Sequence, residues 1–381
     1  MVKVVVAPDS FKGSLTALEV AEQMKLGVKR AIPEAEVEMV PVADGGEGTM
    51  DTLVHHTYGE QKRESVEGPL GDPVEAKWGI LGDKETAVIE MAEASGFNLV
   101  SSDRLNPLQA STYGTGQLIK CALDYGCKRL LLAIGGSATN DGGAGMATAL
   151  GVKLFDEAGV ELKRGGAQLK RLHSISIEDL DPRLRDVEVV VASDVTNPLC
   201  GPNGASFIFG PQKGATDLMV EQLDQALSHY AAVVKETVGK DVKDLPGAGA
   251  AGGLGAGLIA FLDAGLQPGV DLVLDVLGFD EKVNGASLVL TGEGKTDEQT
   301  SFGKVPMGVG LRAKQKQVPV ICISGSLDDG YKKVAKYGVD AFFSITDRPQ
   351  TLDCAMERAD QLVAETVEQV ISVYCLRGPR S

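Results

Sequence analysis

The chain has 381 residues, of which 43% are hydrophobic and 24% charged, a balance typical of a soluble globular protein. This length exceeds one ordinary hydrophobic core and favours two domains. The formal net charge is −16, without a basic tract, which argues against nucleic acid as a partner. No run approaches about 18 consecutive apolar residues, and the N-terminus predicts a first strand and not a signal peptide, so no membrane association is expected.

The six cysteines form no C-x-x-C pair, so we expect reduced thiols and a cytoplasmic protein. None of the four histidines lies within a glycine-rich turn. Zinc sites and Ser-His-Asp chemistry therefore have little support.

Short apolar runs recur along the chain and predict buried strands of parallel sheets covered on both faces. They are residues 2–8, 37–42, 86–92, 129–135, 187–193, 286–292, 318–324 and 339–345. Helical spacing lies between several of them. A capping box, Thr16 to Glu19, predicts the start of the first helix, and residues 352–373 predict the last. The chain is therefore expected to be an α/β protein.

Residues 61–92 break this alternation, because Gly-Pro, Gly-Asp-Pro and Gly-Asp pairs separate short strands there. Such punctuation predicts antiparallel pairing. From about residue 286 the strand–helix alternation returns. We therefore expect a doubly wound parallel-sheet domain from residues 1–64 plus 286–381, with an inserted α/β domain of mixed sheet at 65–285.

Acids, glycines and lysines gather after the predicted strands. In chain order these candidates are Asp9, Ser10, Lys12, Asp44, Gly45, Gly135, Gly136, Ser137, Asp194, Gly292, Glu293 and Lys295. Ligands of open parallel sheets lie beyond the carboxyl ends of strands. Each Asp could instead cap the next helix. Asp9, Asp44 and Asp194 together would repel one another unless a cation or a proton intervened, and Mg²⁺ with bound phosphate would suit them.

The stretch LLLAIGGSATNDGGAGM at 130–146 predicts a strand, a tight turn and a helix start. Gly135 and Gly136 permit a left-handed turn, and the later glycines allow close approach to the first helical turn. A phosphate or carboxylate would fit there, and close helix packing alone would also explain the composition.

Two other glycine-rich stretches resemble nucleotide motifs only formally. GEGKT at 292–296 lacks the first glycine of a Walker A motif, because position 289 is Val. GAGAAG at 247–252 follows VKDLP, which is no buried strand, so a dinucleotide site is not expected. Gly252 and Gly253 are expected at a helix N-terminus, where free N–H groups bind an anion, or simply in a flexible helix start.

Six segments in order carry a family resemblance over nearly the whole chain. They are APDSFKGSL, ADGGEGT, IGGSATNDGGAGM, FGPQKGA, AGAAGGLGAG and TGEGKTD. Together they resemble the class I glycerate kinases, bacterial enzymes that phosphorylate D-glycerate with ATP. The resemblance implies a flavodoxin-like domain, an inserted mixed-sheet domain and an active site in the cleft between them. It also implies ATP and Mg²⁺, with 2-phosphoglycerate as the product.

Site roles are assigned from what phosphoryl transfer requires, namely positioning and charge neutralisation. Asp194 is the candidate base or magnesium ligand, and Asp44 takes the other of those roles. Lys12 is expected to hold phosphate or glycerate, with Asp9 orienting it. Glu293, a further candidate metal ligand, and Lys295 are expected at the nucleotide or metal. The turn FGPQKG is expected to bring Lys213 toward the substrate. For each of these assignments, a surface ion pair is the alternative.

Two other readings stay open. The chain could be a kinase for another small hydroxy acid, or a nucleotide- or anion-binding regulatory protein without catalysis. Carboxylates after several strands favour an enzyme, because a pure binder needs no base. The oligomeric state is expected to be monomer or homodimer.

Overall fold

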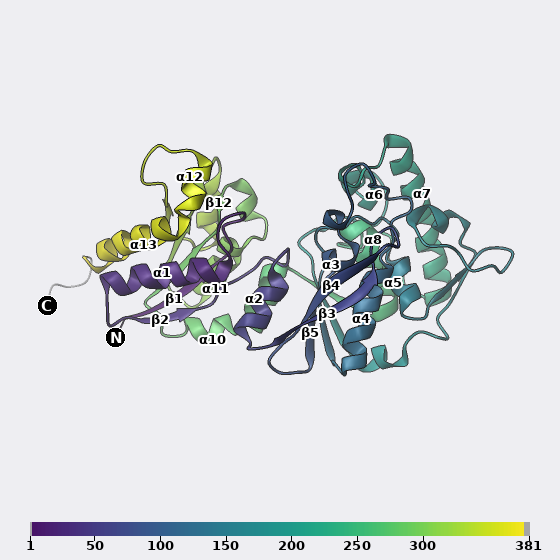
Figure 1. Cartoon of the computed structure of the whole chain (residues 1–381), viewed down its shortest axis with the longest axis horizontal. Helices are drawn as coiled ribbons and strands as arrows, with labels where there is room; N and C mark the ends of the chain where they lie inside the picture. The colour runs from purple at the N-terminus through teal and green to yellow at the C-terminus, as the bar shows by residue number, and fades with distance from the viewer. Residues whose placement is uncertain (1, 377–381) are drawn as a thin grey trace. The chain divides into compact units, whose positions relative to one another are not determined.

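The structure is a computed structural model that describes residues 2–376 (Figure 1). The chain forms two compact units: unit 1 is residues 1–44 with 268–381, and unit 2 is residues 45–267. The sequence-based boundaries lie instead after residues 64 and 285. The chain passes from unit 1 to unit 2 before residue 64, because β3 begins at Glu60 and pairs along its whole length with the next strand of unit 2. The exact domain bounds stay a prediction.

Unit 1 contains a five-stranded, fully parallel sheet. Its strands are β1 (Lys3–Pro8), β2 (Glu36–Met39), β11 (Leu288–Gly292), β13 (Val320–Ser324) and β15 (Ala341–Ser344). They lie in the order β15-β13-β11-β1-β2. Counted along the chain within this unit, that order is 2-1-3-4-5, the flavodoxin-like arrangement. The expected doubly wound parallel sheet is therefore confirmed.

Helices cover both faces of this sheet. They are α1 (Ala17–Ala31), α9 (Gly269–Val276), α10 (Phe279–Val283), α11 (Val305–Gln315), α12 (Leu352–Glu357) and α13 (Ala359–Cys375), with 3-10 turns at Glu298–Ser301 and Tyr331–Tyr337. Val4 and Val6 pack with α1 and α13, which lie side by side in Figure 1. Val5 points to the opposite face and is equally buried, and α11 contacts β1. Burial on both faces explains why β1 reads as an unbroken apolar run.

The first predicted helix start is confirmed. Thr16 Oγ1 accepts a hydrogen bond from Glu19 N, and Glu19 Oε2 accepts one from Thr16 N at 2.8 Å, which completes the capping box. The last helix differs from the expectation, because residues 352–373 form two helices that meet at Arg358. Only the second, α13, buries an apolar face, so the core selects α13 and leaves α12 at the surface.

Unit 2 contains a six-stranded mixed sheet. Its strands are β3 (Glu60–Glu67), β4 (Pro73–Ile80), β5 (Thr86–Glu90), β6 (Arg129–Ala133), β9 (Glu188–Ala192) and β10 (Gly265–Gln267). They lie in the order β10-β9-β6-β5-β4-β3. β3, β4 and β5 pair antiparallel, as their Gly and Pro punctuation predicts, and the remaining pairs are parallel.

The other elements of unit 2 surround this sheet. The helices are α2 (Thr49–His56), α3 (Ala92–Ser95), α4 (Tyr113–Tyr125), α5 (Ala144–Ala149), α6 (Ala205–Phe209), α7 (Asp217–Val238) and α8 (Ala250–Leu262). A small hairpin joins β7 (Lys153–Phe155) to β8 (Ser174–Ser176), and 3-10 turns lie at Phe97–Leu99, Gly166–Arg171, Pro182–Asp186 and Pro211–Lys213. Unit 1 also has two short strands, β12 (Lys295–Thr296) and β14 (Ser326–Leu327).

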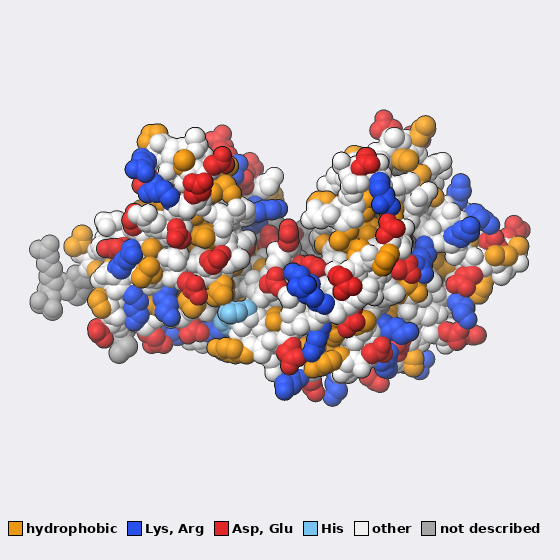
Figure 2. Space-filling view, viewed as in Figure 1, with side chains coloured by type: hydrophobic (Ala, Val, Ile, Leu, Met, Phe, Trp, Pro, Cys, Tyr) orange, Lys and Arg blue, Asp and Glu red, His pale blue; other side chains and the backbone are white. Residues whose placement is uncertain are grey.

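The surface mixes charges of both signs. On the face that Figure 2 shows, Lys and Arg side chains alternate with Asp and Glu side chains over each unit. Within residues 2–376, no helix is long and apolar enough to cross a membrane.

Candidate functional site

The first group of candidates lies at the carboxyl ends of β1 and β11. Asp9 follows β1, and Glu293 follows β11 directly. The N–H of Asp9 donates a 2.8 Å hydrogen bond to the carbonyl of Gly292, which fixes the two strand ends to each other. In a 2-1-3-4-5 sheet the strand order reverses between its first and third strands, here β1 and β11. Open α/β sheets bind ligands at that point.

Three carboxylates of unit 1 interact there. Burial raises the pKa of Asp9 to about 7, and the negative charges of Asp44 and Glu293 add to this shift. A hydrogen bond that Ser10 N donates to Asp9 Oδ1 at 2.6 Å acts in the opposite direction and lowers the pKa. Burial also raises the pKa of Glu293, whose side chain is only 4% exposed, although the Thr300 hydroxyl donates to it at 2.6 Å. Because the charges of Asp44 and Glu293 act on the Asp9 carboxyl group, this region concentrates negative charge and attracts a cation.

The lysines of unit 1 differ in setting. Lys12 is exposed, and Lys295 Nζ lies 2.7 Å from Asp328 Oδ2 in an exposed ion pair. Lys304, which the sequence analysis missed, places Nζ 3.6 Å from Glu293 Oε2. Gly292 has a packing reason to be glycine, because a Cβ there would lie 1.8 Å from the Ile323 carbonyl oxygen.

The second group lies at one edge of the sheet of unit 2. Glu90, Ala133 and Ala192 are level in the registers of β5, β6 and β9. The Gly135–Ser137 turn and Asp194 therefore leave the sheet from neighbouring strands at the same edge. Asp194 is exposed, and no helix begins in residues 193–198, so helix capping does not explain its carboxylate.

A buried lysine donates hydrogen bonds to the turn after β6. Gly135 and Gly136 are exposed, and Gly136 has a φ of 73°, which favours glycine. Lys213 is 1% exposed, and its Nζ donates to Ser137 Oγ at 2.7 Å and to the Thr139 carbonyl at 2.6 Å. Burial lowers the pKa of Lys213 to about 7, although the negative charge of Asp141 acts to raise it. Lys213 thus supports the turn and is not itself exposed to solvent.

The second half of the glycine-rich stretch packs against α8. Gly142 N donates to the Gly252 carbonyl at 3.0 Å. A Cβ on Gly252 would lie 2.0 Å from the Thr139 carbonyl oxygen, and one on Gly253 would lie 2.8 Å from Gly142 Cα. The stretch therefore serves two purposes: its later glycines allow close packing, and Gly135 with Gly136 faces outward. A ligand-binding role for Gly252 and Gly253 stays a prediction.

The chain is similar along nearly its whole length to proteins of one family. The profile of the Glycerate kinase family matches residues 4–375. A glycerate kinase of Halalkalibacterium halodurans is 53% identical over 97% of both chains. A glycerate 2-kinase of Escherichia coli K12 is 52% identical over 94% of both chains.

The chain belongs to the glycerate kinase family. It is an enzyme, a kinase, and the resemblance found in its sequence is confirmed. The fold agrees as well: a Salmonella typhimurium LT2 protein, provisionally described as glycerate kinase 2, superposes with a TM-score of 0.91 at 46% identity, over 98% of both chains.

A kinase needs positive charge near the phosphate groups that it transfers, and Mg²⁺ held by carboxylates can supply that charge. Within residues 2–376, no three His, Cys, Asp or Glu side chains are arranged to hold a metal by themselves. Magnesium in kinases binds through one or two carboxylates, with phosphate and water completing the shell. Asp44 and Glu293, whose charges both act on Asp9 within unit 1, are carboxylates of this kind. One or two such carboxylates are what Mg²⁺ needs from a protein when phosphate and water supply its other ligands.

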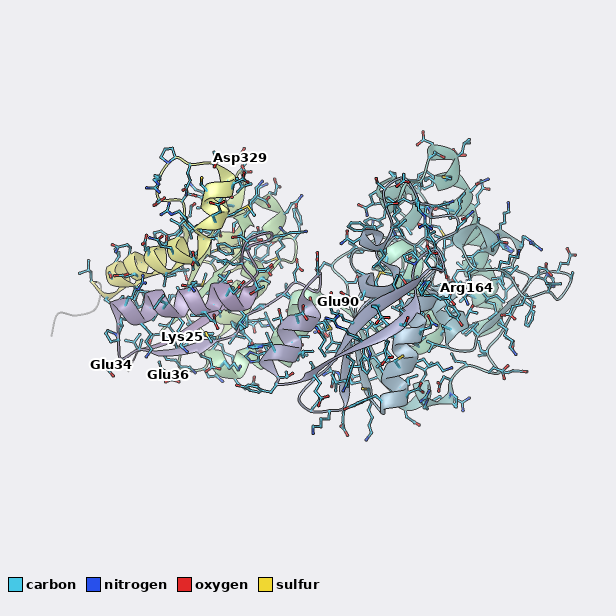
Figure 3. All side chains as sticks on the ribbon, viewed as in Figure 1. Lys25, Glu34, Glu36, Glu90, Arg164 and Asp329 are labelled. Atoms are coloured by element: carbon cyan, nitrogen blue, oxygen red, sulfur yellow. The ribbon has the colours of Figure 1, made fainter. Side chains whose placement is uncertain are left out.

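One further carboxylate of the kinase, Glu90, was not predicted from the sequence. Glu90 ends β5, is 6% exposed, and accepts a 2.8 Å hydrogen bond from Met50 N at the start of α2 (Figure 3). Burial raises the pKa of Glu90 to about 7, with contributions from Glu93, Asp51 and Glu47. The sequence feature that could have identified Glu90 is an acidic residue inside the apolar run TAVIEMA at 86–92. Among the first five predicted strands, this is the one whose carboxyl end supplied no candidate.

Proposed function

We propose that this kinase transfers a phosphoryl group from ATP to the 2-hydroxyl of D-glycerate, giving 2-phosphoglycerate, with Mg²⁺ as cofactor. One observation supports the substrate above all others. Relatives named glycerate kinase or glycerate 2-kinase are about 50% identical to this chain over nearly its whole length. The acids and outward-facing glycines at the strand ends supply the kinds of group that such a reaction needs.

Magnesium would be held by either Asp44 or Asp194, with Glu293 as a further candidate ligand, and when bound it would neutralise negative charge on the phosphate oxygens. Asp194 or Asp44, whichever does not bind the metal, accepts the proton of the attacking hydroxyl. Asp194 suits either role because it is exposed at a sheet edge. Asp44 suits either role because its charge reaches Asp9 beside the switch point of unit 1.

Other residues bind and orient the two substrates. Lys12 is exposed close to Asp9 in sequence and would hold phosphate or glycerate carboxylate. Lys295 and Glu293 are proposed to lie at the nucleotide or metal. The Gly135–Ser137 turn presents little side chain, so an anionic oxygen can approach its backbone. Ser137 accepts a hydrogen bond from Lys213, so its own hydroxyl proton is left for a ligand.

A coupled assay of ADP release tests this proposal. The enzyme is mixed with ATP and Mg²⁺ and with D-glycerate, L-glycerate, glycolate or D-lactate in separate reactions. We expect ADP release with D-glycerate at a kcat/KM at least tenfold above that with any analogue. Glycolate and D-lactate lack the 3-hydroxyl and so leave polar groups of the site unpaired, and L-glycerate has the opposite configuration at C2 and cannot place all its groups as D-glycerate does. A preference for one of the analogues would show a kinase for another hydroxy acid, and no ADP release with any acid would refute the proposed reaction.

A further inference from the structure

Glu90 connects the sheet of unit 2 to the start of α2. Its carboxylate accepts the hydrogen bond from Met50 N at 2.8 Å, although the two residues are 40 positions apart. Gly48, at the N-cap of α2, has no side chain to cap this helix. The first turn of a helix leaves N–H groups unsatisfied, and a carboxylate satisfies them well. Glu90 therefore takes the place of the missing cap.

The loop before α2 consists almost entirely of glycine. Gly45 and Gly48 adopt φ values of 85° and 88°, and with Gly46 they leave only Glu47 with a side chain. The loop runs beside the turn after β6, because a Cβ on Gly135 would lie 3.9 Å from Gly46 Cα. Glycine-rich backbone carries high conformational entropy, so its position depends on what fixes its ends. Met50 is at one end, and Asp44 directly precedes the other.

We propose that Glu90 is a positioning residue of the kinase: through Met50 it fixes the Gly45–Gly48 loop and so sets the backbone beside the Gly135 turn. The proposal rests on the proposed function, because the Gly135–Ser137 turn receives an anionic oxygen of a substrate there. Reaction rates are sensitive to displacements of about 1 Å in groups that orient a substrate. Loss of the Glu90 bond should therefore reduce turnover more than substrate binding.

Two substitutions at Glu90 separate the hydrogen bond from the mere presence of a side chain. Glu90→Met keeps the volume and removes the acceptor, whereas Glu90→Gln keeps an acceptor oxygen for Met50 N. Glu93 offers a matched control, since it also accepts from a backbone N–H, that of Lys77 at 3.1 Å, and lies three residues along the chain. Glu93→Met removes a similar bond to β4 and leaves the bond between Glu90 and Met50 in place.

The first measurement is steady-state kinetics with ATP, Mg²⁺ and D-glycerate, below the unfolding temperature of every variant. We expect Glu90→Met to lower kcat about tenfold or more with both KM values within about threefold of wild type. Glu90→Gln should recover kcat to within about threefold, and Glu93→Met should stay within about twofold. Unchanged kcat in Glu90→Met, no recovery in Glu90→Gln, or an equal loss in Glu93→Met would overturn the proposal.

The second measurement does not depend on activity. Amide hydrogen exchange of a peptide covering residues 44–56, followed by mass spectrometry, reports directly on the loop and the start of α2. We expect faster exchange in Glu90→Met, and wild-type exchange in Glu90→Gln and Glu93→Met. If wild type fails to phosphorylate D-glycerate, the proposed function falls and this exchange pattern still decides whether Glu90 holds the loop. Equal exchange in all four proteins would contradict the inference.

Discussion

The N–H of Asp9 donates to the carbonyl of Gly292 at 2.8 Å, so the chain leaves β1 and β11 from one point of the sheet. The strand order of unit 1 reverses between these two strands. Asp9 is the first residue after β1, and Glu293 is the first residue after β11. Glu293 is buried and Asp9 is partly buried, and desolvation raises the pKa of both carboxyl groups. The position of these acids thus follows from sheet topology.

The first prediction concerns Asp194. Asp194→Asn should fold normally and lose about 10²-fold or more in kcat, the range for removal of a positioned general base. Steady-state kinetics at several Mg²⁺ concentrations distinguish its two possible roles. A metal ligand's loss should be partly recovered at high Mg²⁺ by mass action, and a base's loss should not. Turnover close to wild type at limiting Mg²⁺ would exclude both roles and leave Asp44 as the candidate.

The second prediction compares two glycines. Gly252→Ala should destabilise unit 2 by more than about 2 kcal/mol, because its φ of 68° is left-handed and its Cβ would lie 2.0 Å from a carbonyl oxygen. Gly135→Ala should change stability by less than about 0.5 kcal/mol, since Gly135 is not left-handed and has room for a Cβ. Urea unfolding measures both free energies.

Gly135→Ala is also the cleaner probe of ligand binding. If an anion approaches the backbone of this turn, the added methyl group should raise the KM of one substrate about tenfold, or roughly 1.4 kcal/mol. Kinetics of the folded variant give this value. A Gly135→Ala enzyme with wild-type KM for both ATP and glycerate would show that the turn does not bind either one.

Lys213 provides the third prediction. Lys213→Met keeps the length of the side chain and removes both donors, leaving the Thr139 carbonyl and Ser137 hydroxyl without them. We expect kcat/KM to fall about tenfold or more, because the turn loses its support. Lys235→Met is the control, since Lys235 forms an exposed ion pair with Asp241 at 2.6 Å and such pairs contribute little. Equal kinetics for the two variants would argue against a supporting role for Lys213.

The fourth prediction is the pH dependence of stability at Glu90. Its pKa is raised from 4.5 to about 7 on folding, by burial and by Glu93 on α3, Asp51 on α2 and Glu47 in the loop. The native state therefore binds the proton more tightly than the unfolded state between these values. Stability from this group is present below pH 4.5 and is lost as pH rises through 7. Glu90→Gln removes that loss.

Relative to wild type, Glu90→Gln should gain stability between pH 5 and pH 8, on the order of 2–3 kcal/mol at about 1.4 kcal/mol per pKa unit. The measurement is urea unfolding followed by fluorescence of Trp78, the single tryptophan of the chain, which lies in the core of unit 2. A difference between variant and wild type that does not change with pH would contradict the raised pKa.

Local pattern predicted the fold well where burial is continuous. The apolar runs at 2–8 and 187–193 predicted central strands because parallel strands covered on both faces need no polar alternation. The helix at 352–373 was only partly right. Its break at Arg358 follows from which residues find a core, and that is a long-range property which periodicity alone does not contain.

The candidate site stays a prediction, but where its residues lie in the fold can be compared with the sequence. The residues after each strand were expected at the carboxyl-end edges of the sheets, because chain order fixes where strands end. Burial of Lys213 could not be predicted, since FGPQKG reads as a surface turn and its partners lie 74 and 76 residues away. Likewise the role of Gly252 depends on a contact with Thr139, more than 100 positions earlier in the chain.

Proton-coupled phosphorus NMR of the reaction mixture decides whether the enzyme transfers a phosphoryl group to the 2-hydroxyl of D-glycerate. With enzyme, ATP, Mg²⁺ and D-glycerate, we predict that ATP signals give way to those of ADP and to a phosphomonoester doublet. A doublet arises because phosphate on C2 couples to a single proton. A triplet, from the two protons on C3, would contradict the regiochemistry, and ATP signals that persist unchanged would contradict the kinase reaction on glycerate itself.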